Sequence, residues 1–581
     1  MRLFESFKRH RRERPDAPAF LIASGDRSMP VSWRRFTDDI ETVAHLIRKN
    51  APGSVIGILG ENSYEWMVAH AACLFSGATV VPVEVTLSPE EIASRLVFTE
   101  ARVLICSSLY VEKANEVKAL VPGLILGGFG TRLTDEFLAK SRKELDAEGG
   151  GIFSEAGPDV SKTSMIVFTS GTTSEPKGVE LAISNIEAFC EWTVMMLPMH
   201  EGEHSLMALP LHHIFGMAAT YLMLAKGVAL GVCPDFRRLY DAVERFHAEF
   251  VFVVPALADI LAEKIRHRAE LISGSGATTL RWVLVGGAPM SKKTETRLAN
   301  VGVKAVTGYG LTETCALYSM SPLDEPFRSG SAGRVAGIPG VETSVSDRGE
   351  LLIRGGAVMK GYFKDPEATS AAIDADGWLH TGDSGRIDGD GILWITGRLS
   401  RTIILSSGKK VAPEELEARL LDIPGIKEAF VSGDGESRII TAQVYSELSS
   451  EEIHSRVAAM NGSLPVFKRI NDLVIRMEPF PRTSSGKIKA VAAKRHSPPS
   501  RWALAGRVRR RSFAALAALS LCGVVLAVVD ITLTLLEGAG VAFPRFVSSG
   551  HVWVDVVAAI LLGTFAVMSM WKIRSEEGGR R

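Results

Sequence analysis

The sequence predicts an α/β protein that ends in a pair of transmembrane helices. Ahead of residue 494, short apolar runs alternate with longer stretches of helical periodicity, a rhythm typical of strands covered by helices on both faces. The apolar runs are SVIGIL, TVVPV, RVLIC, SMIVF, FVFVV and RWVLV, and the helical stretches include SYEWMVAHAACLF and NIEAFCEWTVMML. This alternation predicts mostly parallel sheets. Two later apolar stretches are each long enough for the roughly 20 residues that span a bilayer.

The N-terminal segment is basic. Residues 1–14 read MRLFESFKRHRRER, and no apolar run follows them as a secretory signal would require, so we expect the segment to be retained in a cytosolic protein. Leu3, Phe4 and Phe7 share one helical face, which makes a membrane-surface helix one interpretation. A frayed basic end is the simpler interpretation, and it is the one that we prefer.

Composition narrows the class of protein. A chain of 581 residues is longer than a single domain usually is, so its length predicts two or three domains. Lys plus Arg and Asp plus Glu both number 66, so no overall field favours nucleic acid as a partner. The six cysteines lie far apart without metal-ligand spacing, which argues against a disulfide framework or a zinc site and indicates a reducing compartment. We expect most of them to be small core residues.

The pattern changes along the second half of the chain. From Gly349, the stretches GELLIRG and GILWITGR, with turns at DADG and DGDG, predict an antiparallel section. Beyond Gly397 a smaller unit follows. The expected divisions are a large domain over 1–396, a small α+β domain over 397–493, a basic linker over 494–511 and a transmembrane hairpin over 512–572.

The hairpin consists of residues 513–536 and 552–571, joined by a short loop. The linker before it carries seven Lys and Arg residues and no acid, whereas Arg545 is the single Lys or Arg of the loop. By the positive-inside bias, both ends of the hairpin and the domains before it face the cytoplasm. Asp530 and Asp555 fall close to the outer interface, where a carboxylate can reach water. The sequence therefore predicts a soluble region of about 490 residues in the cytoplasm, anchored to membrane lipid by its C-terminal hairpin.

The stretch VFTSGTTSEPKGV at 167–179 has the parts of a polyphosphate-binding loop. It lacks both the GxxxxGK[ST] order of the nucleoside-triphosphatase loop and the GxGxxG of a dinucleotide site. Glycine permits close approach of the backbone, hydroxyl groups donate hydrogen bonds, and a lysine supplies a cation. These residues are Thr169, Ser170, Gly171, Thr172, Thr173, Lys177 and Gly178. Alone, such a loop is more often just a turn.

Further motifs follow in order, and together they carry a resemblance. They are LPLHHIFG at 209–216, VLVGGAP at 283–289, TGYGLTET at 307–314, GELLIRG at 349–355, GWLHTGD at 377–383, GRLSRTIILSSGKKVAPEELE at 397–417 and PRTSSGKIK at 481–489. With the loop at 167–179, this series resembles the adenylate-forming superfamily, which includes acyl-CoA synthetases, luciferases and nonribosomal peptide adenylation domains. The resemblance covers about residues 15–493. The segment after Gly397 looks most like long-chain acyl-CoA and acyl-carrier-protein synthetases.

The resemblance implies a fold and two half-reactions. A large adenylate-forming domain would work with a small domain that moves between the two steps. In the first step, MgATP and a carboxylic acid give an acyl-adenylate and pyrophosphate; in the second, a thiol attacks the acyl-adenylate. The first step is an in-line displacement at the α-phosphate, for which positioning and charge neutralisation supply most of the acceleration.

The resemblance also implies roles for single residues. The loop from Thr169 to Lys177 would hold the β and γ phosphates, and Glu313 would bind Mg²⁺ with help from Thr169. Asp383 would accept hydrogen bonds from the ribose hydroxyls, and Lys487 would bridge the carboxylate and the α-phosphate. The remaining positions are Gly287, Ala288, Pro289, Gly308, Tyr309, Gly310 and Thr312 around the adenine and nucleotide, Arg398 at ribose or phosphate, His213 beside the acyl pocket and Gly408 at the incoming thiol.

The sequence shows three departures from the family pattern. Ser174 stands where the loop usually has glycine, and the region of Ile183 replaces a histidine often found after the loop. Ser400 and Arg401 stand where the hinge of the small domain usually has Lys and Asp. The hinge departure bears on the second half-reaction more than on the first.

The function predicted from the sequence is therefore a membrane-anchored ligase that joins a medium- or long-chain fatty acid to coenzyme A, with ATP and Mg²⁺ as cofactors. Two alternatives within the same class are an acyl-carrier-protein synthetase and a ligase that stops at the fatty acyl-adenylate. An alternative of another class is a membrane-tethered pseudoenzyme that acts as a scaffold. Retention of Lys177, Glu313, Asp383 and Lys487 argues against the scaffold.

Overall fold

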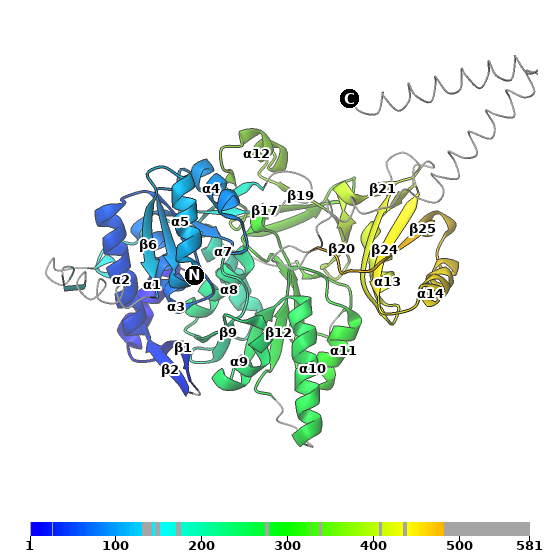
Figure 1. The fold of residues 1–581 in the computed structure, drawn as a ribbon, viewed down its shortest axis with the longest axis horizontal. Helices are drawn as coiled ribbons and strands as arrows, with labels where there is room; N and C mark the ends of the chain where they lie inside the picture. The colour runs from blue at the N-terminus through cyan, green and yellow to red at the C-terminus, as the bar shows by residue number, and fades with distance from the viewer. Residues whose placement is uncertain are drawn as a thin grey trace, which may run out of the picture. The chain divides into compact units, whose positions relative to one another are not determined.

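The protein is described here by a computed structural model of the chain (Figure 1). The described residues are 2–488, apart from 26, 131–141, 144, 146–150, 170–175, 273–277, 327, 336–339, 406–408, 434–438 and 482–487. The predicted linker and transmembrane hairpin lie outside this part of the chain. Within it, none of the helices combines the length and the apolar character that crossing a bilayer requires.

A seven-stranded sheet forms the first part of the large domain, in the order β18-β8-β7-β4-β3-β5-β6. The five strands β7, β4, β3, β5 and β6 are parallel, while β8 pairs antiparallel with β7 on one side and with the edge strand β18 on the other. The strands are β3 Val55–Leu59, β4 Thr79–Val83, β5 Val103–Ser107, β6 Ile125–Phe129, β7 Thr163–Phe168, β8 Gly178–Ala182 and β18 Gly361–Tyr362. Four of the predicted apolar runs are strands of this sheet.

Helices cover both faces of this sheet because successive strand residues point to opposite sides. Val80 enters the core that contains α3, whereas Val81 enters the core that contains α4 and α5. The helices are α2 Trp33–Asn50, α3 Tyr64–Ser76, α4 Pro89–Phe98, α5 Val111–Leu120 and α7 Ile183–Met196. Local chemistry fixes their ends: Ser88 and Glu91 form a capping box on α4. The predicted helical stretches at α3 and α7 are confirmed.

A nine-stranded sheet forms the second part, in the order β11-β12-β13-β14-β15-β20-β19-β17-β16. Its strands are β11 Phe250–Val253, β12 Trp282–Val285, β13 Lys304–Tyr309, β14 Ser319–Met320, β15 Gly333–Arg334, β16 Val341–Val345, β17 Glu350–Gly355, β19 Leu379–Ile387 and β20 Ile392–Arg398. Its helices are α9 Leu239–Phe246, α10 Pro255–Ile272, α11 Lys292–Asn300 and α12 Pro366–Ala372. Figure 1 shows α10 and α11 lying next to each other beside β12.

The expectation of mostly parallel sheets is wrong for this second sheet. Only β11, β12 and β13 pair in parallel among its described strands, and every later pairing is antiparallel. The predicted antiparallel section after Gly349 is confirmed, but antiparallel pairing already begins at β14. Strands β14 and β15 have two residues each, which is too short to produce a periodic signal in the sequence.

A smaller four-stranded sheet has the order β2-β1-β10-β9. It joins the N-terminal hairpin to strands from the middle of the chain, with β1 and β10 parallel. Its strands are β1 Pro18–Ser24, β2 Arg27–Ser32, β9 His204–Met207 and β10 Ala229–Val232, and α8 Ile214–Ala225 connects the last two. The five cysteines among the described residues are buried, as predicted.

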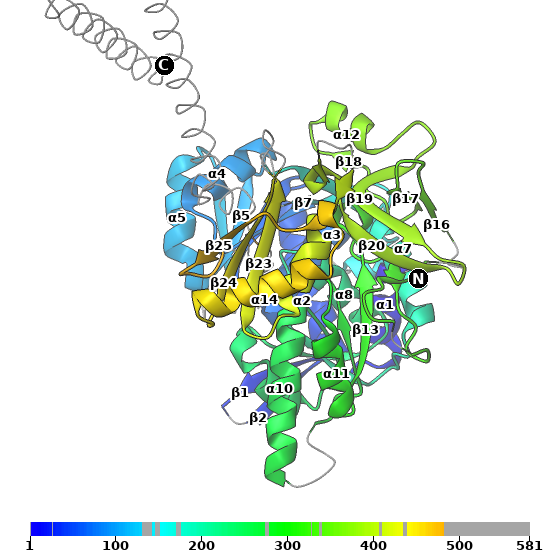
Figure 2. The same ribbon diagram turned by 90° about the vertical axis from the view of Figure 1, so that its right-hand side faces the viewer.

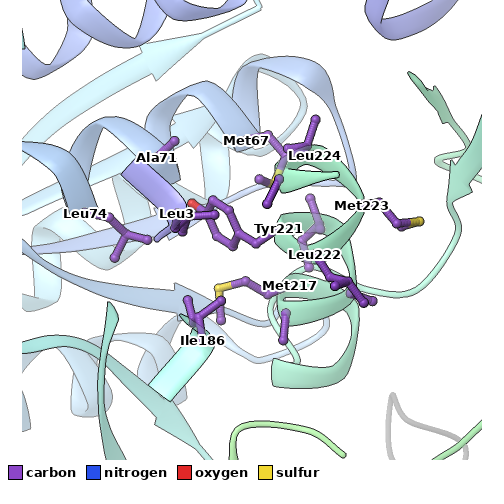
Figure 3. Packing of buried hydrophobic residues seen from close by; sticks show 14 of the residues in the cluster. Leu3, Met67, Ala71, Leu74, Ile186, Met217, Tyr221, Leu222, Met223 and Leu224 are labelled. Atoms are coloured by element: carbon purple, nitrogen blue, oxygen red, sulfur yellow. The ribbon is translucent and has the colours of Figure 1, made fainter. Parts of the chain in front are cut away.

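The N-terminal segment is an ordered helix, α1 Leu3–Glu13, so the expectation of a frayed basic end is wrong. Leu3, Phe4 and Phe7 do share a face, but that face is buried in the protein core rather than available to a membrane surface. The ring of Phe4 stacks on Phe153 at 5.1 Å. Figure 3 shows Leu3 among core side chains of α3, α7 and α8. Of the basic residues, Arg11 pairs with Asp38 and Glu41 of α2, whereas Arg12 pairs with Glu13 of α1 itself.

The region after β20 has its own small core. A three-stranded sheet in the order β23-β24-β25 packs with two helices, and Figure 2 shows α14 beside these strands. The elements are β21 Ile403–Ile404, β22 Lys410–Val411, α13 Pro413–Leu421, β23 Ile426–Gly433, β24 Ile440–Ser446, α14 Ser450–Gly462 and β25 Asp472–Arg476. An α+β unit was expected in this part of the sequence.

Candidate functional site

The candidate phosphate loop is the connection of a β-hairpin. Strands β7 and β8 pair antiparallel on either side of it, and the backbone N–H of Thr169 donates to the carbonyl of Lys177 at 3.0 Å. The two ends of the loop are therefore held together by the sheet. Ser170, Gly171, Thr172 and Thr173, which were predicted to contact phosphate, lie outside the described residues, as does Ser174.

Lys177 and Glu313 both contact the side chain of Tyr362. The Lys177 ammonium lies 4.7 Å from the centre of the Tyr362 ring, and the Tyr362 hydroxyl donates to Glu313 Oε1 at 2.9 Å. Strand β18 places Tyr362 opposite Val179, two residues beyond Lys177. Burial, followed by the charge of Glu313, raises the pKa of Tyr362, so its hydroxyl keeps the proton that it donates. This tyrosine was missed by sequence reasoning.

A tight turn presents Glu313. The residue belongs to the short 3₁₀ helix η4, Thr312–Thr314, which follows β13. A Cβ at Gly310 would lie 1.4 Å from the carbonyl oxygen of Ala316, so glycine is required there. Cys315 and Ala316 have φ values of 50° and 87°, in the left-handed region that non-glycine residues rarely adopt. The strain indicates that the surrounding contacts hold this turn in one conformation.

The residues predicted to surround the adenine lie at the carboxyl ends of two neighbouring strands of the nine-stranded sheet. Strands β12 and β13 are parallel and in register, with Val285 opposite Thr307. Gly287, Ala288 and Pro289 follow β12, whereas Gly308 and Tyr309 end β13, and Gly310 and Thr312 follow directly. The carboxyl ends of parallel strands are a common place for ligands to bind in α/β proteins. The structure therefore brings these predicted positions together.

Asp383 and Arg398 face each other on neighbouring strands. They are register partners on β19 and β20, and Arg398 Nε lies 2.6 Å from Asp383 Oδ1. The hydroxyl of Tyr309 donates to the other carboxylate oxygen. Burial and the Asp383 charge raise the pKa of Tyr309 well above its usual value.

The predicted ribose acceptor is thus already engaged on both oxygens, which the sequence did not indicate. The side chain of Asp383 is only 5% exposed, so burial and these two contacts hold its carboxylate in one orientation.

His213 precedes α8, and its backbone carbonyl accepts from Met217 N–H at 3.1 Å. Its ring lies beside that of His212, with centroids 4.3 Å apart. Burial, with the neighbouring imidazole as a smaller cause, lowers the pKa of His212 to about 3, so His212 is neutral at physiological pH. At the base of α8, Phe215 lies against Gly286: a Cβ there would come within 2.9 Å of the ring. The 209–216 motif therefore packs against the 283–289 motif.

The oxygen donors of the candidate site fit a Mg²⁺ ion that is bound mainly through substrate phosphates. Among the described residues, no group of three or more His, Cys, Asp or Glu side chains could hold a metal ion by itself. Glu313 offers one carboxylate and Thr169 one hydroxyl, both hard oxygen donors. Mg²⁺ is usually bound through one or two carboxylates together with substrate phosphates. This donor set suits such a site and does not suit a site built from protein groups alone.

Arg401, which stands where the resemblance places a hinge, is held by acids of the helix that follows. It ends the 3₁₀ helix η5, Leu399–Arg401, and its guanidinium pairs with Glu414 at 2.9 Å and with Glu417, both on α13. Burial raises the pKa of Glu414. The predicted site residues Gly408 and Lys487 lie outside the described part of the chain.

Comparison with known proteins identifies the family. Residues 7–363 match the AMP-binding enzyme family, and residues 400–496 match the AMP-binding enzyme C-terminal domain. The first match alone spans more than half of the chain. The chain therefore belongs to the AMP-binding enzyme family, as the motifs indicated.

Individual relatives support this assignment. A 4-coumarate-CoA ligase of Narcissus pseudonarcissus is 31% identical, over 75% of this chain and 81% of the relative. A long-chain-fatty-acid–CoA ligase of Mycobacterium bovis is 29% identical, over 72% and 80%. The fold is similar to that of Bacillus subtilis O-succinylbenzoate coenzyme A synthetase in complex with ATP and magnesium ion, with a TM-score of 0.71, 23% identity and coverage of 84% of this chain and 99% of that one.

Proposed function

We propose that this chain is an AMP-forming acid–CoA ligase that activates a carboxylic acid with ATP. One observation carries the proposal. The segment from Tyr309 to Glu313 contacts Asp383 at one end and, through Tyr362, approaches Lys177 at the other. A group suited to ribose and a group suited to a triphosphate are therefore connected through one five-residue segment, which favours a single nucleotide site over two separate ligand sites. The named CoA ligases among the relatives support the same activity.

In the first half-reaction, a carboxylate oxygen bonds to the α-phosphorus while the bond from that phosphorus to the bridging oxygen breaks, and pyrophosphate leaves. Lys177 and the loop hold the leaving phosphates, and Asp383 fixes the ribose. Lys487 neutralises charge between the carboxylate and the α-phosphate. Bound Mg²⁺ would supply charge neutralisation at the phosphate oxygens. Most of the acceleration comes from this positioning and electrostatic stabilisation.

In the second half-reaction, the thiolate sulfur of coenzyme A bonds to the acyl carbon, AMP leaves with the former acyl-phosphate oxygen, and the thiol proton passes to solvent. The small domain over 397–493 turns between the two steps, which brings Gly408 to the entering pantetheine. Arg401, paired with Glu414 and Glu417, stands at that hinge. An acyl carrier protein in place of coenzyme A, or release of the acyl-adenylate, are the alternatives within the class.

The acid that we propose is a medium- or long-chain fatty acid. Support comes from the fatty-acid-specific name of one relative and from the form of the segment after Gly397. The 4-coumarate ligases among the relatives favour an aromatic acid instead. The apolar stretches at 513–536 and 552–571 favour the fatty acid, since a membrane anchor holds the enzyme where such a substrate partitions. We propose that this hairpin leaves the catalytic domains in the cytoplasm.

A panel of acids tests the proposal. The purified chain is given MgATP with acetate, octanoate, palmitate or 4-coumarate, and pyrophosphate release is followed before and after addition of coenzyme A. Release with any acid, together with a CoA thioester in mass spectra, supports the ligase. Thioester from 4-coumarate but not from palmitate would overturn the fatty-acid assignment alone. Absence of pyrophosphate with all of the acids would favour the scaffold alternative.

A further inference from the structure

We propose that Tyr362 is a positioning residue that couples Lys177 of the phosphate loop to the carboxylate of Glu313, so that the triphosphate and the metal are bound together. The inference rests on the proposed function and adds a residue to its site. Tyr362 belongs to none of the motifs at 167–179, 307–314 or 377–383, and it reaches the site only because β18 pairs with β8.

The hydroxyl of Tyr362 orients Glu313. It donates to Oε1 at 2.9 Å, and from the same segment the N–H of Met359 donates to the Glu313 carbonyl at 2.8 Å. The turn that carries Glu313 is thus held at both its backbone and its side chain. A hydrogen bond to one oxygen fixes the rotation of a carboxylate, and so fixes the direction in which its remaining lone pairs point.

The ring of Tyr362 supports Lys177. The ammonium lies 4.7 Å from the ring centre, within the range of a cation–π interaction. Lysine has a flexible side chain, and ordering it on binding phosphate costs conformational entropy. A ring that keeps the Lys177 ammonium near the loop before binding reduces that entropy loss. The two interactions use different parts of the tyrosine, which means that substitutions can separate them.

The backbone of Tyr362 is itself well fixed. Its N–H donates to Thr369 Oγ1 at 2.9 Å, and the N–H of the next residue, Phe363, donates to the carbonyl of Gly178 at 2.7 Å. A Cβ at Gly361 would come within 2.8 Å of the Thr369 side chain. A rigid support is what positioning requires, because a loosely held phenol would lose its orientation along with that of Glu313.

The test separates the hydroxyl from the ring. Tyr362→Phe removes only the hydroxyl, Tyr362→Leu removes both, and Tyr240→Phe on α9 is the matched control. Two affinities are measured without turnover: that of ATP in EDTA, by titration calorimetry, and that of Mn²⁺ for the enzyme–ATP complex, by electron paramagnetic resonance.

For Tyr362→Phe we expect Mn²⁺ affinity to fall about tenfold, the size typical of a lost partner of a metal ligand, with ATP affinity in EDTA within about twofold of wild type. Excess Mg²⁺ should restore pyrophosphate release, which a folding defect would not allow. For Tyr362→Leu we expect ATP affinity in EDTA to fall as well, by about threefold. The control should match wild type.

Three results would overturn the inference: unchanged Mn²⁺ affinity in Tyr362→Phe, an equal loss of both affinities in the two Tyr362 variants, or the same losses in Tyr240→Phe. If instead the wild-type chain binds no ATP, the proposed function fails together with the inference. Wild-type ATP binding with unaffected variants would reject Tyr362 alone.

Discussion

Lys487 and Gly408 are expected to serve different half-reactions. In the proposed mechanism, the ammonium of Lys487 is needed only while charge shifts between the carboxylate and the α-phosphate. Lys487→Ala should therefore lower adenylation by at least the roughly 10²- to 10³-fold loss seen for one oxyanion-hole donor. Thioester formation from presynthesised acyl-adenylate should survive. Both steps are measured separately, by pyrophosphate release and by thioester yield.

Gly408→Leu is the matched comparison for this pair. A bulky side chain at the entry of the pantetheine should leave pyrophosphate release intact and abolish most thioester formation. An equal loss of both half-reactions in Lys487→Ala would contradict the separation of roles and would leave Lys487 as a structural residue.

A buried histidine makes the fold sensitive to acid. His70 is fully buried on α3, where its Nδ1 is 2.7 Å from the Tyr221 hydroxyl and its ring stacks on Trp66. Burial lowers the pKa of His70 to about 3, whereas in the unfolded chain it titrates near 6.5. As pH falls below about 6.5, His70 becomes protonated in the unfolded state but stays neutral in the folded state. Stability should therefore fall, by about 2 kcal/mol at pH 5 from this residue alone.

The double variant His70→Leu with Tyr221→Phe isolates this contribution, because replacing both partners by apolar groups leaves no unpaired polar atom. Urea unfolding is followed by tryptophan fluorescence at pH 7.5 and pH 5.0. We expect wild type to lose about 2 kcal/mol more than the double variant between these two values. An identical loss in both proteins would mean that His70 becomes protonated inside the fold.

At the scale of an element, helix α1 is a structural part of the large domain. Phe7 is completely buried against Trp33, Phe36 and Phe75, with ring centres 5.5 to 5.6 Å away. Phe7→Ala should destabilise the protein by about 3–5 kcal/mol, through lost burial and the cavity left behind. The measurement is urea unfolding of the chain truncated after residue 493.

Val97→Ala, on α4, is the control for Phe7→Ala. Val97 is 58% exposed, so its substitution should change the stability by less than about 0.5 kcal/mol. A Phe7→Ala variant that keeps full stability but loses binding to lipid vesicles would restore the membrane-surface interpretation of this helix.

Elements differ in how far the sequence predicts them. The long apolar runs such as β4 and β12 are strands, as predicted, because a strand buried on both faces is apolar throughout. Strand β18 has two residues and no pattern of its own. Its importance comes from pairing with β8, which lies far from it in the sequence, and no local propensity encodes that pairing.

At the scale of the whole molecule, the residues proposed for catalysis all precede the basic linker. Truncation after residue 493 should therefore leave an active enzyme that stays in the supernatant, whereas the full chain should sediment with membranes. Each basic residue of the linker adds only about 1 kcal/mol of attraction to anionic lipid, so the apolar stretches should dominate membrane binding. Flotation with liposomes of neutral lipid and of anionic lipid measures the apolar and the electrostatic contributions separately. A truncated chain that still floats with neutral liposomes would contradict the hairpin as the main anchor.

The sequence by itself determined the family and the α/β class, and it named the residues of the candidate site as predictions. Glu313 and Asp383 were predicted through the collinear motifs that contain them, because the order of several motifs along the chain carries the resemblance that a single residue does not. Tertiary structure alone decided three things: that Leu3, Phe4 and Phe7 face the core, that Tyr309 and Arg398 already engage Asp383, and that Tyr362 joins Lys177 to Glu313. Each depends on contacts between segments distant along the chain, and such contacts are fixed by how sheets and helices pack together rather than by the local sequence.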